Sequence, residues 1–143
     1  MKTDKTVELM ETMFVVFRLM KEKMSHLNNL AQLSMLQMQA LVFLNQNKNT
    51  SMGDIADYFH IELSSATSLL NKLCEQKLVE RHEDPEDRRL VMITLTHKGK
   101  SLLKQVINER RKIMEKMLSY LSVKEKTELL HILKTLNTKL QTK

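Results

Sequence analysis

Two groups of side chains in this sequence have the types and spacing of a surface that binds a polyanion. The first group lies in residues 63–77, a segment of helical periodicity, and the second ends a charged turn at residues 84–89. Small hydroxyl side chains let a helix backbone approach a ligand closely, and guanidinium groups are suited to negatively charged grooves. The first group consists of Ser64, Ser65, Thr67, Ser68 and Lys72, and the second of Asp87, Arg88 and Arg89.

The DNA-binding interpretation of both groups has to be weighed against a structural one. Serines and threonines often only begin a helix, and a pair of arginines often lies in a solvated turn. The hairpin pattern that follows the helix favours the first interpretation, because helix and hairpin could then enter neighbouring grooves of a duplex. Asp87 is expected to hold a neighbouring arginine by a charge-assisted pair. Arg81 either contacts phosphate or pairs with Glu83, and the sequence leaves both open.

Catalytic and metal-binding arrangements are not apparent in the sequence. With 2 Gly and 1 Pro, the chain cannot form the glycine-rich loops that hold phosphates, and it shows no nucleophile elbow or zinc-protease helix. Its five histidines are scattered, so we expect no metal, no cofactor and no enzymatic activity. The single cysteine, Cys74, excludes an intramolecular disulfide and is more typical of an inert thiol than of a redox sensor.

Length and charge indicate one basic domain. The chain has 143 residues, 42% of them hydrophobic, and a formal net charge of +6. The positive excess lies in residues 101–143, whereas residues 51–100 carry seven basic and nine acidic side chains. Apolar runs are too short for a membrane span, and the start does not resemble a signal peptide, so a cytoplasmic location is expected.

The elements that position the two groups follow from hydrophobic periodicity and capping signals. Three capping boxes are predicted, at Ser34 with Gln37, at Ser51 with Asp54, and at Ser122 with Glu125. The period changes to two over residues 79–83 and 90–95, which predicts a β-hairpin around the only proline. Helices are predicted at about 6–30, 34–46, 51–59, 63–77, 97–120 and from 122 onward. The inward face predicted for 34–46 includes Leu36 and Leu41, and the one predicted for 97–120 includes Ile107. The expected fold is mainly α with a small β-hairpin wing.

Three sequence segments resemble the signature of the MarR family (multiple antibiotic resistance regulators). They are LCEQKLVER at residues 73–81, DPEDRR at 84–89 and VMITLTHKG at 91–99. The family pattern there runs L-E-x-x-G-L-V-x-R, D-P-x-D-R-R and V-x-L-T-x-x-G. The similarity covers about residues 30–100, and it implies a winged helix-turn-helix flanked by N- and C-terminal dimerisation helices.

The resemblance implies a single MarR-like domain over residues 1–143. Its DNA-binding lobe would span 34–98, and its dimerisation helices 1–30 and 100–143. The family resemblance also implies a homodimer that binds a pseudo-palindromic operator in double-stranded DNA, usually as a repressor, and is released by a small aromatic effector. By the same resemblance, helix 63–77 reads the major groove and Arg89, with Arg88 nearby, reaches the minor groove.

The sequence departs from the family pattern at four positions. Ser68 stands where an arginine is common, and Glu62 where a serine or threonine usually caps the helix. His60 and Lys77 replace turn glycines, so both are expected to adopt a left-handed backbone at a cost of about 1 kcal/mol each. These changes affect operator sequence and affinity more than the fold.

Two further interpretations remain open at this stage. Side chains on the apolar face of the first helix could line an effector pocket, although methionines and phenylalanines at helical spacing are more often core residues. The slightly acidic middle of the chain also suits a winged-helix protein-interaction module, such as an antirepressor, without specific DNA binding. The candidate pocket residues are Met13, Phe14, Phe17 and Met20.

Overall fold

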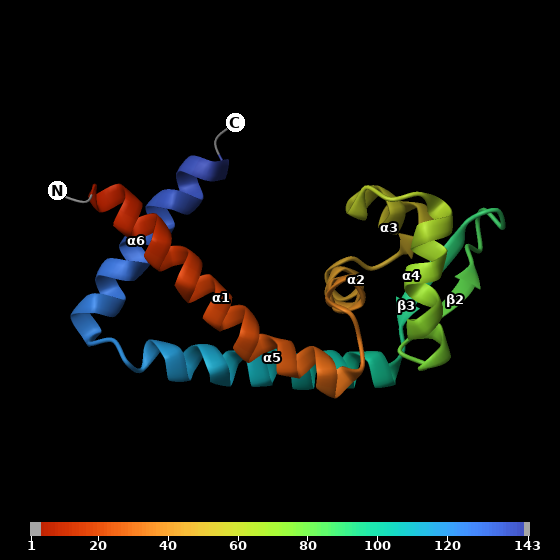
Figure 1. Cartoon of the computed structure of the whole chain (residues 1–143). Coiled ribbons are helices and arrows are strands. Elements are labelled where there is room, and N and C mark those ends of the chain that lie inside the picture. Colours follow the sequence, from red (N-terminus) through yellow and green to blue (C-terminus); the bar gives the residue numbers. More distant parts are fainter. Residues whose placement is uncertain (1–3, 142–143) are drawn as a thin grey trace. The chain divides into compact units, whose positions relative to one another are not determined.

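The computed structural model describes residues 4–141, apart from the side chains of residues 28–30, and is mainly helical with one small sheet (Figure 1). This confirms the predicted fold class. The helices are α1 (Lys5–Ala31), α2 (Met35–Gln46), α3 (Met52–Phe59), α4 (Leu63–Glu75), α5 (His97–Leu118) and α6 (Val123–Gln141), and the strands are β1 (Thr50–Ser51), β2 (Val79–Glu83) and β3 (Val91–Leu95).

The chain forms two compact units, one up to Asn108 and one from Glu109 onward. The boundary lies within α5, so the first unit holds α1 to β3 and the start of α5, and the second holds the rest of α5 and α6. Over residues 4–141, none of the helices combines the length and the hydropathy that a membrane crossing needs.

The sheet has the strand order β1-β3-β2, and both pairings are antiparallel. Strands β2 and β3 form the predicted hairpin, in register from Val79 opposite Leu95 to Glu83 opposite Val91. We call this hairpin, residues 79–95, the wing. Strand β1 was not predicted, because two residues are too short to show an alternating pattern. It pairs Thr50 with Ile93 and adds a third strand beside the wing.

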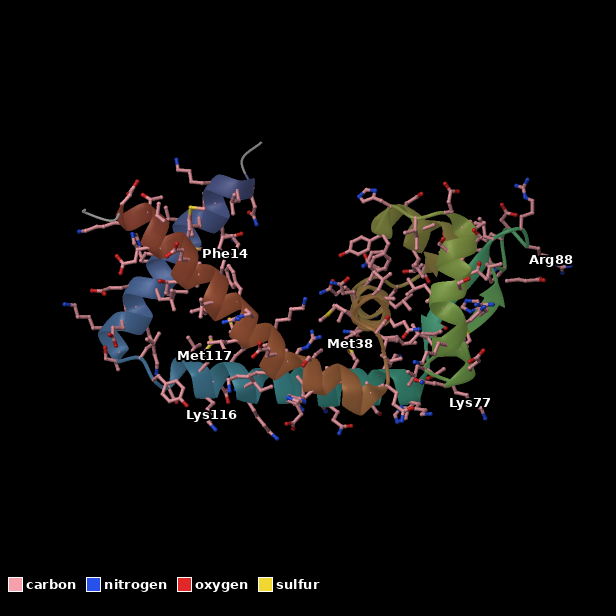
Figure 2. All side chains as sticks on the ribbon, viewed as in Figure 1. Phe14, Met38, Lys77, Arg88, Lys116 and Met117 are labelled. Atoms are coloured by element: carbon pink, nitrogen blue, oxygen red, sulfur yellow. The ribbon has the colours of Figure 1, made fainter. Side chains whose placement is uncertain are left out.

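Buried apolar side chains hold the elements from α2 to β3 together. We call this part, residues 35–95, the central lobe. Its fully buried side chains come from all three helices and from the sheet, and one of them, Met38 of α2, is labelled in Figure 2. Burial of this many aliphatic groups fixes α4 against its neighbours, since each contributes roughly 1.5–3 kcal/mol. The largest of them are Met38, Leu41, Ile55, Leu70, Leu73, Leu78 and Ile93.

All three predicted capping boxes are present. Ser34 and Gln37 exchange hydrogen bonds of 2.9 and 3.1 Å at the start of α2. Ser51 and Asp54 do the same at the start of α3. Before α6, the Ser122 amide donates to Glu125, and the Glu125 amide donates back to the Ser122 hydroxyl. Each box satisfies backbone N–H groups that a helix start leaves without partners.

The predicted inward faces were wrong in places. Leu36 was expected to be buried but is exposed, whereas Gln37 and Met38 are buried. Helix α2 is apolar on nearly all sides, so its periodicity has little contrast. Ile107 of α5 is also exposed, and α6 has no buried residue at all.

The two turns that lack the family glycines adopt the expected left-handed backbone. His60 has φ 53° and Lys77 has φ 58°. Helix α4 therefore ends at Glu75, two residues before the predicted end, because a left-handed residue at position 77 cannot continue it. Gly99, in the first turn of α5, lies against the Leu78 carbonyl so closely that a Cβ atom would collide with it.

Candidate nucleic-acid interface

Helices α3 and α4 are joined by the short turn of residues 60–62, which fixes the angle at which α4 leaves the core. The amide of Ile61 donates to the Ala56 carbonyl at 3.0 Å, and left-handed His60 reverses the chain. One face of α4 is then anchored by its buried residues Ala66, Leu70 and Leu73. Because one face is buried, the opposite face of α4 is presented to solvent.

The exposed face of α4 carries most of the predicted residues. Ser64, Ser65, Ser68 and Lys72 are all exposed. Thr67 differs, because it is half-buried and its hydroxyl donates to the Leu63 carbonyl at 3.0 Å. The face thus offers three free serine side chains and one lysine over about two helical turns.

The tip of the wing is held by hydrogen bonds within the turn. Asp84 Oδ1 accepts the amides of Glu86 and Asp87 at 2.7 and 3.1 Å. The Leu90 amide donates to the Asp87 carbonyl, and the Asp84 amide donates to the Leu90 carbonyl, which closes the turn. A carboxylate that accepts two consecutive backbone amides is a typical device for fixing such a loop.

Asp87 holds Arg89 in the pair that the sequence predicted. The Arg89 Nε and Nη2 atoms donate to the two carboxylate oxygens at 3.0 and 3.1 Å, and the Arg89 amide donates to Oδ1 at 3.1 Å. The side-chain bonds from Arg89, and then its amide, lower the pKa of Asp87, and the same pair raises the pKa of Arg89. With 89% of its side chain exposed, Arg89 is held in direction but remains open to a ligand.

Arg88 is the other cation of the wing tip. It is exposed, and Figure 2 shows its side chain at the outer end of the wing, directed outward from the lobe. The two neighbouring arginines therefore differ: Arg89 has a fixed orientation, whereas Arg88 extends into solvent. An extended arginine is suited to a phosphate, and an oriented one to a narrow groove.

A contact of Arg81 links the wing to α4, and sequence reasoning missed it. Its Nη2 atom donates to Asn71 Oδ1 at 2.8 Å and to the Thr67 carbonyl at 3.4 Å. The sequence left a choice between phosphate and Glu83, and the contact found here is neither. Arg81 lies on the same face of β2 as the buried Val79, and its side chain reaches α4. Residues so far apart in sequence give no signal of such a contact.

Other residues singled out from the sequence lie away from this surface. On α1, Met13, Phe14 and Phe17 are exposed and Met20 is half-buried. Cys74 is half-buried and lines a groove of about 650 Å³ beside the end of α4. Among the described residues, no group of histidine, cysteine and acidic side chains has an arrangement that could hold a metal ion.

Known proteins with similar sequences are bacterial transcriptional regulators. Residues 31–90 match the MarR family. The HTH-type transcriptional regulator YfiV of Bacillus subtilis is 33% identical over 94 residues, which are 66% of this chain and 59% of YfiV. The HTH-type transcriptional repressor MdtR of the same organism is 27% identical over 67% of this chain and 62% of its own length. The aligned part thus spans about three fifths of these relatives.

Solved structures share the fold over nearly the whole chain. YusO of Bacillus subtilis superposes with a TM-score of 0.86 at 22% identity, covering 96% of this chain and 99% of YusO. The F27L mutant of Staphylococcus aureus MepR, solved bound to an oligodeoxyribonucleotide, gives a TM-score of 0.74 at 23% identity over 93% and 98% of the two chains. By sequence match over residues 31–90 and by fold, the chain is similar to winged helix-turn-helix transcriptional regulators of the MarR family.

Proposed function

We propose that this protein is a homodimeric repressor that binds a pseudo-palindromic operator with α4 in the major groove and the wing in the minor groove. The observation that carries the proposal is the exposed serine face of α4 together with an arginine held in direction at the wing tip. Both parts belong to the same central lobe, and the Arg81 contact ties one to the other. Ser64, Ser65, Thr67, Ser68, Lys72, Asp87, Arg88 and Arg89 are the proposed DNA-binding residues.

The acidic side chains of the lobe are compatible with this role because several are already occupied. Asp54 caps α3, Asp84 accepts two turn amides, and Asp87 is paired with Arg89. Their charges are directed into local hydrogen bonds, so they oppose a phosphate backbone less than their number suggests. Glu62, by contrast, caps α4 without a side-chain hydrogen bond and leaves its charge near the proposed interface.

Exposed apolar side chains on α1 and on α6 support the proposed homodimer. On α1, Leu9, Phe14 and Phe17 are 56–67% exposed, and on α6 Leu130 and Leu133 are each 53% exposed. Large apolar side chains exposed together on one helix face are typical of an interface. In a twofold dimer the two α4 helices would lie about 34 Å apart and meet successive major grooves on one side of the duplex.

The known relatives support DNA binding and repression. MdtR is named as a repressor, and MepR has been solved with an oligodeoxyribonucleotide. We carry both properties over to this chain as part of the proposal. A repressor of bacterial genes acts where the chromosome is, so the proposed location is the cytoplasm.

An effector pocket on α1 is the regulatory part of the proposal. The face with Met13, Phe14, Phe17 and Met20 would contact a small aromatic molecule between α1 and the central lobe. Such a ligand would favour a separation of the two α4 helices that the operator cannot match, and so release the DNA. A thermal-shift screen with aromatic acids and cationic dyes tests this, and the absence of any ligand that both stabilises the protein and releases DNA contradicts it.

A salt-dependent mobility shift on the DNA upstream of the chain's own gene tests DNA binding. If each protomer neutralises about four phosphates, the plot of log K against log salt concentration has a slope near −7. Arg89→Ala should weaken binding by about tenfold or more, most strongly for operators with A·T-rich flanks. Arg111→Ala is the control, because Arg111 forms a similar exposed pair with Glu115 on α5.

Two outcomes would contradict the proposal. Equal binding of the Arg89→Ala variant and the unmodified protein to all flanking sequences would exclude insertion of the wing into the minor groove. Failure to bind any duplex below micromolar concentration would favour the alternative, a winged-helix protein-interaction module or antirepressor. In that case the exposed carboxylates of the wing would be its contact groups.

A further inference from the structure

The recognition face of α4 lacks the side chain that most often reads a base. Helix α4 contains no arginine, and Lys72 is its only cation. Bidentate contacts from arginine to guanine therefore cannot come from this helix. Serine hydroxyls can donate to or accept from any base, so they discriminate weakly. Apart from a contact of Lys72 with guanine, base discrimination by α4 then needs another kind of contact.

An apolar side chain at the leading end of α4 offers that contact. Leu63 is the first helical residue after the N-cap Glu62, and it is 56% exposed. The start of a recognition helix is the part that enters the major groove most deeply. Thymine alone among the four bases presents a methyl group there, and an apolar side chain is its natural partner.

Leu63 is part of a small apolar patch rather than a single exposed leucine. It lines a groove of about 430 Å³ between α3, α4 and the wing, together with Leu90 and Val91. Those two side chains are 44% and 41% exposed. The same groove is lined by Arg81 and Arg89, so its apolar wall lies beside the cation of the wing tip. A patch in this place would be covered when the lobe binds DNA.

We propose that Leu63 is a specificity-determining residue that contacts the C5-methyl group of a thymine in each operator half-site. Leu90 and Val91 form the apolar wall that keeps this contact dry. The inference rests on the proposed DNA binding and deepens it, because it names the chemical group that α4 reads. The operator half-site then contains a thymine whose methyl group, and not only its hydrogen bonds, contributes to affinity.

Replacement of thymine by deoxyuridine tests the contact directly. The probe is a duplex selected by the unmodified protein from a random pool, with each thymine of one half-site replaced in turn. Deoxyuridine pairs with adenine in the same way but lacks the methyl group. At one position the unmodified protein should bind about threefold to fivefold more weakly, as expected for loss of one buried methyl group.

The Leu63 variants assign the effect to this residue. Leu63→Ala should bind thymine and deoxyuridine duplexes equally at that position, whereas Leu63→Met should keep a preference for thymine. Leu36→Ala removes an exposed leucine of α2 away from the groove and should leave the ratio unchanged. Circular dichroism and thermal melting check that each variant is folded.

The outcomes separate this inference from the proposed function. Steep, salt-dependent binding to the thymine duplex with no sensitivity to deoxyuridine at any position would overturn the Leu63 contact and leave DNA binding intact. A sensitivity that persists unchanged in Leu63→Ala would overturn it as well. Failure to bind the thymine duplex at all would contradict both.

Discussion

The central lobe and the terminal helices α1 and α6 contain similar kinds of apolar side chain but place them differently. In the lobe, the six elements from α2 to β3 pack around side chains such as Leu41, Leu70 and Ile93, each at most 1% exposed. On α6 no residue is buried, and most of α1 up to Leu19 is exposed. The lobe thus has its core within one chain, whereas α1 and α6 each carry exposed apolar side chains, which the proposed dimer would cover. Changes in the two regions should therefore have different consequences.

The largest effect is expected where the first turn of α5 packs against the lobe without space for a side chain. Gly99→Ala places a Cβ atom against the Leu78 carbonyl and within 3.3 Å of the Leu95 side chain, so the unfolding free energy should fall by about 3 kcal/mol. Gly53→Ala is the matched control, because its Cβ would meet only Ser51 Oγ at 3.6 Å. That variant should be unchanged or more stable by up to about 1 kcal/mol. Urea denaturation measures both, and equal stability of the two variants would contradict the packing of Gly99.

The next prediction concerns the assembly of the proposed dimer and not the folding of the chain. Leu133→Glu places a charge on the apolar face of α6 and should convert the dimer into monomers, as measured by sedimentation. Affinity for a two-half-site operator should fall by about 100-fold or more, because the second half-site is no longer tethered. Thr135→Glu, on the opposite face of α6, should change neither. A dimer that survives Leu133→Glu would show that this face is not the interface.

A smaller effect is expected at the left-handed turn that ends α4. Lys77→Gly relieves the backbone cost of φ 58°, and the unfolding free energy should rise by about 0.5–1 kcal/mol. Gln76→Gly is the matched control, since its φ of −79° needs no glycine and the substitution should be destabilising. A stability change of the same sign in both variants would contradict this interpretation.

The smallest effect concerns protonation at the wing tip. Because the hydrogen bonds from Arg89 lower the pKa of Asp87, the pair is fully formed above the usual aspartate pKa and is lost only as the pH falls through the lowered value. Operator binding should therefore show no step from Asp87 between pH 5 and 8. An NMR titration of the Asp87 carboxyl carbon measures its pKa, which should rise in Arg89→Ala. An identical titration curve in both proteins would show that the pair does not persist in solution.

Local signals in the sequence predicted the helices and the hairpin well. They could not predict contacts between residues that lie far apart in the chain. The three capping boxes, the hairpin and the Asp87–Arg89 pair all involve residues close in sequence, where residue type decides the geometry. The extent to which α2 is buried depends on neighbours from other parts of the chain, so its periodicity misplaced Leu36. Strand β1 exists only because β3 lies beside it.

The same distinction applies to the candidate site. The serine face of α4 and the arginines of the wing were found from residue type and spacing. The role of Arg81 was not, because its partner Asn71 is ten residues away on another element. The exposed position of Leu63 was also missed, since a leucine in a helical pattern is expected to face the core.

The Arg81 contact limits how such a protein can be regulated. Because Arg81 of β2 is hydrogen-bonded to α4, the two proposed DNA-contacting parts of one lobe are linked, and a distant ligand should change their mutual geometry little. An effector could still change the register of the two lobes of the proposed dimer along the duplex. Binding to operators with one base pair inserted or removed at the dyad would measure how large a change in register the protein tolerates. An effector should shift the preferred operator length.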